Sequence, residues 1–142
     1  QAIAADGVRQ GAAAVAPTAP IGCSWSRHNR WQTGWSGFVG MMVKEKRIAY
    51  KVGKFPFSAN GRARTAGETE GFVKIVRDAK YGEILGAHII GPHATELIHE
   101  LAVARENEFT VEEVELAIHA HPTLSEVIME AAEMVEGHAI HI

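Results

Sequence analysis

The sequence predicts an α+β fold, an antiparallel β-sheet with helices packed on one face. Two observations predict it. Segments with strand patterns come first, and three segments with helical spacing follow them between Pro92 and the C-terminus. Strands that precede the helices, instead of alternating with them, favour an α+β layer over a parallel α/β sheet. The length of 142 residues allows one domain with a substantial hydrophobic core.

The first strand pattern covers Ala49–Phe57, where side chains alternate in the manner of a half-buried strand. Pro56 limits the last part of this segment to a sheet edge or to an exit from the sheet, because proline cannot donate to a strand ladder. Residues 58–70 are rich in turn-forming residues, with Asn60-Gly61 as the clearest break. We therefore expect an edge strand followed by a turn.

A β-hairpin is predicted next. Gly71–Asp78 and Glu83–Gly91 are apolar segments with strand character, and a short loop containing Gly82 separates them. Upstream of the first strand, residues 42–48 (MVKEKRI) are expected to be the end of a short helix.

Three helices should follow the strands. Pro92 ends the hairpin and can open the first helix, and Thr110 begins the second because it forms a capping box with Glu113. The third helix follows the stretch His119–Glu126. The positions predicted to be buried by their helical spacing are Ala94, Leu97, Ile98, Leu101 and Ala102 in the first helix, Val111, Val114 and Ile118 in the second, and Leu124, Val127, Ile128, Ala131 and Val135 in the third.

Residues 1–41 have a different character. They are rich in alanine, glycine and proline at first, and all three tryptophans lie between Cys23 and Gly40. Arginines between the tryptophans could form a platform for single-stranded nucleic acid, but no nucleic-acid-binding motif accompanies them. The alternative is a segment whose tryptophans cover part of a neighbouring core. We predict two parts: a divergent segment, 1–41, that could be irregular, and a folded domain, 42–142, for which a family resemblance given below implies a dimerisation domain.

The net charge of −3 conceals an uneven distribution. From Pro92 to Ile142 there are eleven Glu and one basic residue, Arg105, a balance of −10, so the remaining 91 residues carry +7. This acidic segment disfavours nucleic acid and would suit a basic protein partner, although the residues alone favour a set of solvated helix faces. No apolar run approaches the ~20 residues of a membrane span. The single cysteine, Cys23, excludes an internal disulfide and indicates a reducing, cytoplasmic compartment.

The stretch His119–Glu126, HAHPTLSE, allows three interpretations. Thr123 and Glu126 have the spacing of a capping box, in which case the histidines are incidental. His119 and His121, with the two histidines of the C-terminal HAIHI, could bind a metal. Eight histidines in the chain produce such pairs by chance, and we expect no metal.

The third interpretation is acid–base chemistry. Histidine has an ordinary pKa of about 6.5, and a carboxylate that receives one ring N–H fixes the tautomer of the other nitrogen. Glu126, in the first turn of the third helix, could fold back towards His121 and leave its second nitrogen free as a general base. The bond between His121 and Pro122 could be cis, which costs little before proline. The residues alone leave the three interpretations open.

A family resemblance favours the third. The segments AIHAHPTLSEVIMEAA, YKVGKFPFSANGRA, GFVKIVRDAKYGEILGAHIIGP and AAEMVEGHAIHI resemble the C-terminal part of the dihydrolipoyl dehydrogenase family. These enzymes belong to the flavin-dependent pyridine nucleotide–disulfide oxidoreductases. The resemblance covers about Met42 to Ile142. His-Pro-Thr marks the wider superfamily, and the fuller motif with GEILGAHIIGPHATELIHE before it is more specific to the lipoamide branch.

The resemblance implies a dimerisation, or interface, domain made of an antiparallel sheet flanked by helices. It implies that His121 is the catalytic base, oriented by Glu126, and that it removes a proton from a dihydrolipoamide thiol. In this family each such histidine reaches into the active site of the other subunit, so a homodimer is expected. His119 and Pro122 match positions near the flavin of the partner subunit. The family also implies docking of a basic subunit-binding domain from the acyltransferase of a 2-oxo acid dehydrogenase complex.

The sequence lacks the cofactor-binding and redox motifs of the family. The flavin fingerprint G-x-G-x-x-G, the redox-active C-x4-C pair and the NAD-binding domain are not found in it. FAD and NAD belong to the full-length family, and no cofactor is expected on this chain alone, which should be inactive by itself as an NAD-dependent oxidoreductase. The abrupt change before Met42 suggests a truncated or rearranged copy. The alternative function is a non-catalytic module, a remnant that dimerises or binds another protein.

Overall fold

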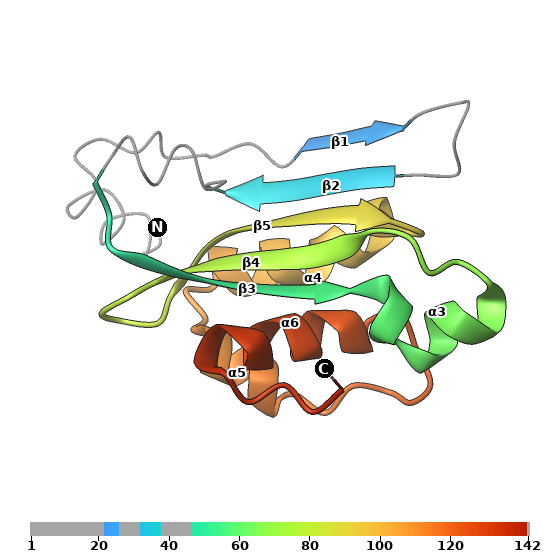
Figure 1. Ribbon diagram of the computed structural model, residues 1–142. Coiled ribbons are helices and arrows are strands. Elements are labelled where there is room, and N and C mark those ends of the chain that lie inside the picture. The colour runs from blue at the N-terminus through green and yellow to red at the C-terminus, as the bar shows by residue number, and fades with distance from the viewer. Residues whose placement is uncertain (1–21, 26–31, 38–46, 142) are drawn as a thin grey trace.

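The computed structural model describes residues 22–25, 32–37 and 47–141. Within these ranges the chain forms a sheet and a set of helices (Figure 1). The elements in chain order are β1 (Gly22–Trp25), β2 (Gln32–Gly37), β3 (Tyr50–Pro56), the 3-10 helix η1 (Phe57–Ala59), α3 (Gly61–Ala66), β4 (Phe72–Asp78), β5 (Ile84–Gly91), α4 (Ala94–Glu106), α5 (Val111–Leu116) and α6 (Glu126–Glu136). Among the described residues, no helix combines the length and the apolar character needed to cross a membrane.

The sheet has five strands in the order β1-β2-β5-β4-β3, and every neighbouring pair is antiparallel. The predicted hairpin is present, because β4 pairs with β5 and Phe72 lies opposite Ile90. β3 is an edge strand that ends at Pro56, as the proline predicted. The antiparallel sheet of the sequence prediction is therefore confirmed.

Two strands, β1 and β2, lie within the segment 1–41 that was expected to diverge, and β2 pairs with β5 along its length. The other residues of this segment lie outside the described part of the chain, as do the tryptophan side chains and most of the predicted helix end at 42–48. The division at residue 42 stays a prediction.

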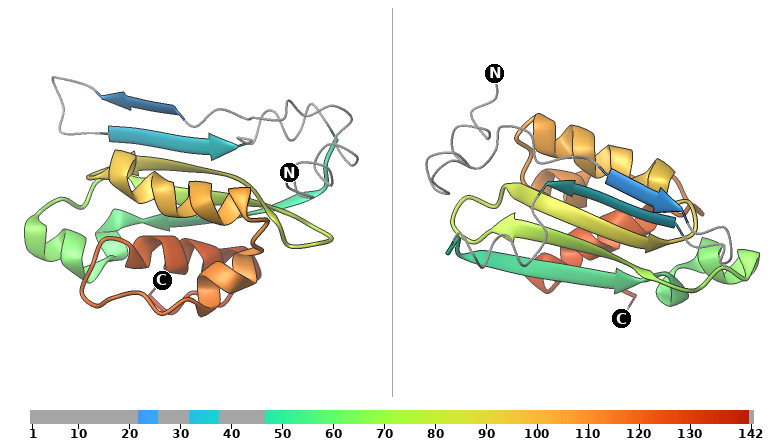
Figure 2. Two further views of the ribbon diagram at one scale, coloured as in Figure 1. Left: turned by 180° about the vertical axis from the view of Figure 1, so that it is seen from behind. Right: turned by 90° about the horizontal axis from the view of Figure 1, so that it is seen from above.

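The helices cover one face of the sheet (Figures 1 and 2). α4 packs against β2 and β5, α6 packs against β3 and β4, and α5 packs against α6. Between the layers lies one hydrophobic core, whose largest fully buried side chains are Phe55, Phe57, Ile75, Ile89, Ile98, Leu101 and Ile128. The predicted α+β layer with helices on one face is confirmed.

Gly53 on β3 explains how closely α6 approaches the sheet. A Cβ atom added at this position would overlap the backbone oxygen of Ala131 and the side chain of Val135, both on α6. Only glycine lets the two backbones meet at this distance. This contact fixes the position of α6, the helix that begins at Glu126.

The helical spacing predicted most of the buried positions correctly. Thr110 and Glu113 form the expected capping box, in which the Glu113 carboxylate accepts hydrogen bonds from the Thr110 backbone N–H and hydroxyl. The prediction for Ile118 was wrong, because α5 ends at Leu116 and the backbone is extended at Ala117. The Ile118 side chain is fully exposed, at 100%. Leu97 and Leu124 are only partly buried at the edge of the core.

Helix α3 was not predicted from the sequence. The Asn60-Gly61 pair predicted a turn, but the Asn60 side-chain Oδ1 accepts a hydrogen bond from the Ala63 backbone N–H at 2.9 Å and caps a short helix. Asparagine favours both turns and helix N-caps, because its side chain bonds nearby backbone N–H groups. The helix ends at Gly67, whose φ of 71° is left-handed.

Candidate functional site

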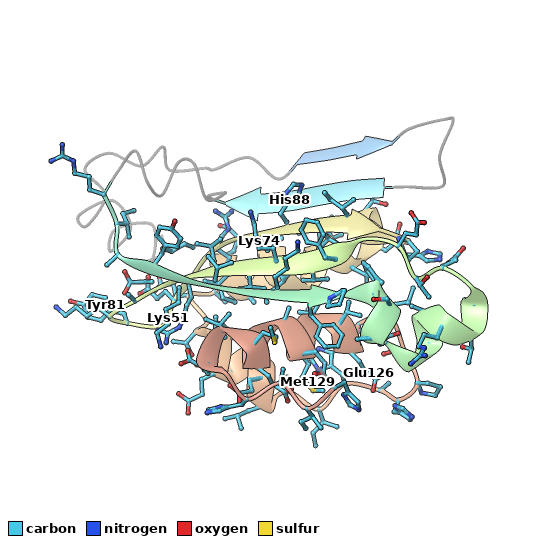
Figure 3. All side chains as sticks on the ribbon, viewed as in Figure 1. Lys51, Lys74, Tyr81, His88, Glu126 and Met129 are labelled. Atoms are coloured by element: carbon cyan, nitrogen blue, oxygen red, sulfur yellow. The ribbon has the colours of Figure 1, made fainter. Side chains whose placement is uncertain are left out.

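The HAHPTLSE stretch forms the loop between α5 and α6 and the first residue of α6. Figure 3 shows Glu126 at the end of α6 that faces α3. The bond between His121 and Pro122 is cis, as the sequence allowed. Pro122 is exposed in this loop.

His121 and Glu126 form the pair that the sequence predicted. The Nδ1 atom of His121 lies 2.8 Å from Oε1 of Glu126. The His121 side chain is 79% exposed and that of Glu126 is 18% exposed. The other ring nitrogen of His121, Nε2, has no partner within the described part of the chain. A carboxylate partner on Nδ1 places the proton there, so Nε2 carries the free lone pair of a base.

A second hydrogen bond fixes Glu126. Its Oε2 atom accepts from the Thr123 backbone N–H at 2.8 Å. Burial pushes the pKa of the Glu126 carboxyl upward, but the hydrogen bonds from Thr123 and His121 outweigh it and hold this pKa below its usual value. Glu126 is therefore an ionised acceptor for His121 over the neutral range of pH.

The capping interpretation was half correct. The predicted bond from Glu126 back to Thr123 is present, but α6 begins at Glu126, and its N-cap is Ser125. The Thr123 hydroxyl donates to the Ala120 carbonyl at 2.6 Å instead of capping α6. The Thr123 hydroxyl therefore stabilises the loop, because its hydrogen bond to Ala120 spans His121 and Pro122.

His119 has a different environment from His121. Its side chain is only 7% exposed, and its Nε2 lies 2.7 Å from Oε1 of Glu100 on α4. Its Nδ1 lies 2.8 Å from the backbone oxygen of Ala117. Both neighbours are acceptors, so both ring nitrogens donate when the ring is protonated. The Glu100 hydrogen bond raises the pKa of His119 against the opposing effect of burial, and Ala117 adds to the rise.

Asn60 joins the loop to α3 and was not predicted as part of the site. It is buried, with 6% of its surface exposed. While Oδ1 caps α3, the side-chain Nδ2 donates to the backbone oxygen of Thr123 at 3.1 Å, across 63 positions of sequence. Asn60 and Glu100 are the two residues of the site that the sequence analysis missed. In the sequence, Asn60 was part of a predicted turn, and Glu100 was one of eleven glutamates between Pro92 and Ile142. Neither signal pointed to the site.

The metal interpretation receives no support. His138 pairs with Glu115 at 3.4 Å, and His141 pairs with Glu130, so these histidines and those of the loop each have a separate glutamate. In residues 22–25, 32–37 and 47–141 no group of three or more His, Cys, Asp or Glu could hold a metal ion.

With this geometry established, comparison with known proteins identifies the domain. Residues 24–132 match the family model of the pyridine nucleotide-disulphide oxidoreductase dimerisation domain. The chain belongs to this family. The match begins upstream of Met42, inside the segment that the sequence analysis set apart.

Curated relatives narrow the family to the lipoamide branch. The chain is 54% identical over 107 residues to dihydrolipoyl dehydrogenase of Corynebacterium glutamicum, which covers 74% of this chain and 23% of that protein. It is 52% identical over 111 residues to the enzyme of Thermus scotoductus, covering 76% of this chain and 24% of that protein. The chain thus spans about a quarter of the length of these relatives. It is a dimerisation domain of dihydrolipoyl dehydrogenase-like oxidoreductases.

Solved structures agree on the fold. LpdA from Mycobacterium tuberculosis superposes with a TM-score of 0.74 at 29% identity, covering 80% of this chain and 24% of that one. The flavoprotein disulfide reductase RclA from Escherichia coli gives a TM-score of 0.70 at 23% identity, covering 73% of this chain and 24% of that one, and shows the fold alone.

These flavoprotein neighbours are consistent with FAD and NAD in full-length members of the family. Both ring nitrogens of His119 already face Glu100 and Ala117, and Glu126 is already bonded to His121 and Thr123. The expectation that His119 and Pro122 contact a flavin in a partner subunit stays a prediction.

Proposed function

We propose that this domain supplies the general base for dihydrolipoamide oxidation, with His121 as the base and Glu126 as its orienting carboxylate. The observation that carries the proposal is the 2.8 Å contact between His121 Nδ1 and Glu126 Oε1, which leaves Nε2 exposed and free. The identity to dihydrolipoyl dehydrogenases supports the choice of substrate.

The chemistry of this step is a proton transfer. Nε2 of His121 takes the proton of a dihydrolipoamide thiol, and the ring becomes an imidazolium that Glu126 stabilises through Nδ1. The product is a thiolate, which is the form of sulfur that attacks a disulfide. The low pKa of Glu126 keeps the carboxylate charged, so the proton stays on the imidazole.

A chimeric enzyme tests the proposal. Residues 24–132 and the C-terminal tail would replace the corresponding part of the C. glutamicum enzyme, and NAD-dependent oxidation of dihydrolipoamide would be measured. We expect activity from the chimera and a fall in kcat of about 10²- to 10⁴-fold for His121→Gln, the usual contribution of a general base.

His138→Gln is the matched control, because His138 is an exposed histidine paired with a glutamate on the same chain. It should leave kcat unchanged. A His121→Gln chimera with the activity of the parent would refute the assignment of His121 as the base. A chimera that binds flavin but oxidises no dihydrolipoamide would favour the alternative function, a non-catalytic module.

We also propose that the domain forms a homodimer, because it belongs to a dimerisation-domain family. Exposed large apolar side chains occur next to the loop, with Ile118 at 100% and Leu116 at 71% exposure. Contiguous exposed apolar patches mark protein–protein interaction sites, and these two side chains are two positions apart. Light scattering should give twice the mass of the chain, and Ile118→Lys should reduce the dimer. Val52→Lys is the control and should leave the dimer unchanged. Val52 is exposed and lies on the sheet face away from α6, because its neighbour Gly53 faces α6.

The acidic segment Pro92–Ile142 supports a further proposed partner, a basic subunit-binding domain of an acyltransferase. Opposite charge steers such an association and makes it sensitive to salt. The same light-scattering measurement, repeated with that domain at low and high salt, checks it. Binding that does not change with salt would contradict electrostatic docking.

A further inference from the structure

His121 lies between two loop residues that are each tied to another part of the fold. Two positions before it, the His119 side chain contacts Glu100 on α4. Two positions after it, the Thr123 backbone oxygen accepts from Asn60 at the N-cap of α3. We propose that Asn60 and Glu100 are positioning residues that hold this loop so that His121 meets Glu126. The proposal rests on the proposed role of His121 as the base.

The Asn60 anchor belongs to a continuous chain of hydrogen bonds. Asn60 Nδ2 donates to the Thr123 oxygen, the Thr123 N–H donates to Oε2 of Glu126, and Oε1 of Glu126 accepts from His121 Nδ1. Asn60 is buried and held from its other end by the Ala63 N–H. The chain therefore connects a fixed point on α3 to the ring of His121 in three steps.

The Glu100 anchor fixes the opposite flank. His119 is almost fully buried, and its two nitrogens bridge Glu100 on α4 and the Ala117 oxygen at the end of α5. A buried imidazole with both nitrogens engaged has a single orientation. The backbone of His119 is thereby fixed against α4, one peptide unit away from the residue that precedes His121.

The loop needs such anchors because His121 contributes little to its own placement. Its ring is 79% exposed and it packs against no core, so its orientation depends on the backbone and on Glu126. A base must reach its proton within hydrogen-bonding distance, and a displacement of about 1 Å can cost on the order of 10²-fold in rate.

Histidine tautomers measured by long-range ¹H–¹⁵N NMR on the whole chain test the proposal. At about pH 8, where histidine is ordinarily neutral, an exposed free ring carries its proton mainly on Nε2. A ring oriented by Glu126 carries it on Nδ1 instead. We therefore expect the Nδ1–H form at His121 in the unaltered chain.

Two variants remove the anchors. Asn60→Ser keeps an oxygen for the α3 cap but has no amide donor for Thr123, and Glu100→Leu removes the partner of His119. Each should lower the Nδ1–H fraction of His121 by about two-fold or more, because which nitrogen carries the proton follows the hydrogen bond. Glu100→Gln should rescue the signal, since its amide can still bond Nε2 of His119. Should Asn60→Ser fail to fold, Asn60→Asp keeps the cap acceptor and also lacks the amide donor.

Two matched controls alter similar groups away from the loop. Asn107→Ser removes an amide donor to the Val103 oxygen, and Glu106→Leu removes a carboxylate from the same helix as Glu100. Neither should change the His121 tautomer. A folded anchor variant with unchanged His121 signals would overturn the positioning roles and leave the base intact. An Nε2–H ring in the unaltered chain would instead overturn the His121–Glu126 pair, and with it the proposed function.

Discussion

His119 and His121 are two positions apart in one loop, and each pairs with a glutamate, yet the two pairs lie in opposite environments. The His119 side chain is 7% exposed and His121 is 79% exposed. His119 uses both ring nitrogens, on Glu100 and on the Ala117 oxygen, whereas His121 uses only one. The same side-chain chemistry therefore gives a structural contact in one case and an available lone pair in the other.

An imidazole–carboxylate contact alone does not distinguish a histidine suited to act as a base from one that anchors a loop. Two other properties do: the burial of the ring and the number of its hydrogen-bond partners. A base needs a nitrogen that a substrate proton can reach. His119 has none, and its raised pKa keeps the ring charged further into the neutral range. His121 has Nε2. The loop thus combines a histidine whose two ring nitrogens are both engaged with one whose Nε2 has no partner within the described part of the chain.

The largest stability effect should come from breaking the pair of His119, whose side chain is 7% exposed, and Glu100, whose side chain is 37% exposed. His119→Gln should lower the free energy of unfolding by about 1–3 kcal/mol, because it leaves Glu100 without its charged donor. His119 has a folded pKa above its ordinary 6.5, so its contribution is fully present below that value and is lost as pH rises through the raised value. Urea unfolding of both proteins between about pH 6 and about pH 9 should show the difference shrinking as pH rises.

Two other groups also have raised pKa values, and the comparison with the variant removes their contribution. His141 also has a raised pKa, chiefly through Glu130, and burial raises that of Glu133. Both are present in the unaltered chain and in His119→Gln. A difference that grows from pH 6 to pH 9 would have the wrong sign for a raised histidine pKa and would contradict the assignment.

The sequence predicted the fold well where local periodicity and tertiary packing agree. The hairpin, the capping box at Thr110 and the buried stripe of α4 all follow from short-range spacing. The errors occur where the chain leaves a regular element. Ile118 continued the helical spacing of Val111 and Val114, but α5 had already ended at Leu116. Asn60-Gly61 is equally suitable for a turn and for a helix start, and only the surrounding fold selects the helix.

The site was predictable within the motif and not beyond it. His121 and Glu126 are five positions apart and meet through one loop, so spacing could bring them together. Glu100 lies 19 positions from His119, and Asn60 lies 63 positions from Thr123. Such contacts depend on where α4 and α3 pack, which a single sequence does not specify locally. The eleven glutamates between Pro92 and Ile142 offered no reason to choose Glu100.

The smallest stability effect should come from the exposed pair. His121→Gln should change the free energy of unfolding at neutral pH by no more than about 0.5 kcal/mol, because solvent screens exposed ion pairs. Glu126 has a lowered pKa, so its own contribution is present above its ordinary 4.5 and is lost only as pH falls through the lowered value. Urea unfolding at about pH 7 checks the first expectation, and urea unfolding on the acid side of 4.5 checks the second. A loss at pH 7 as large as that of His119→Gln would mean that the loop is held by His121 itself, and the distinction between anchor and base would fail.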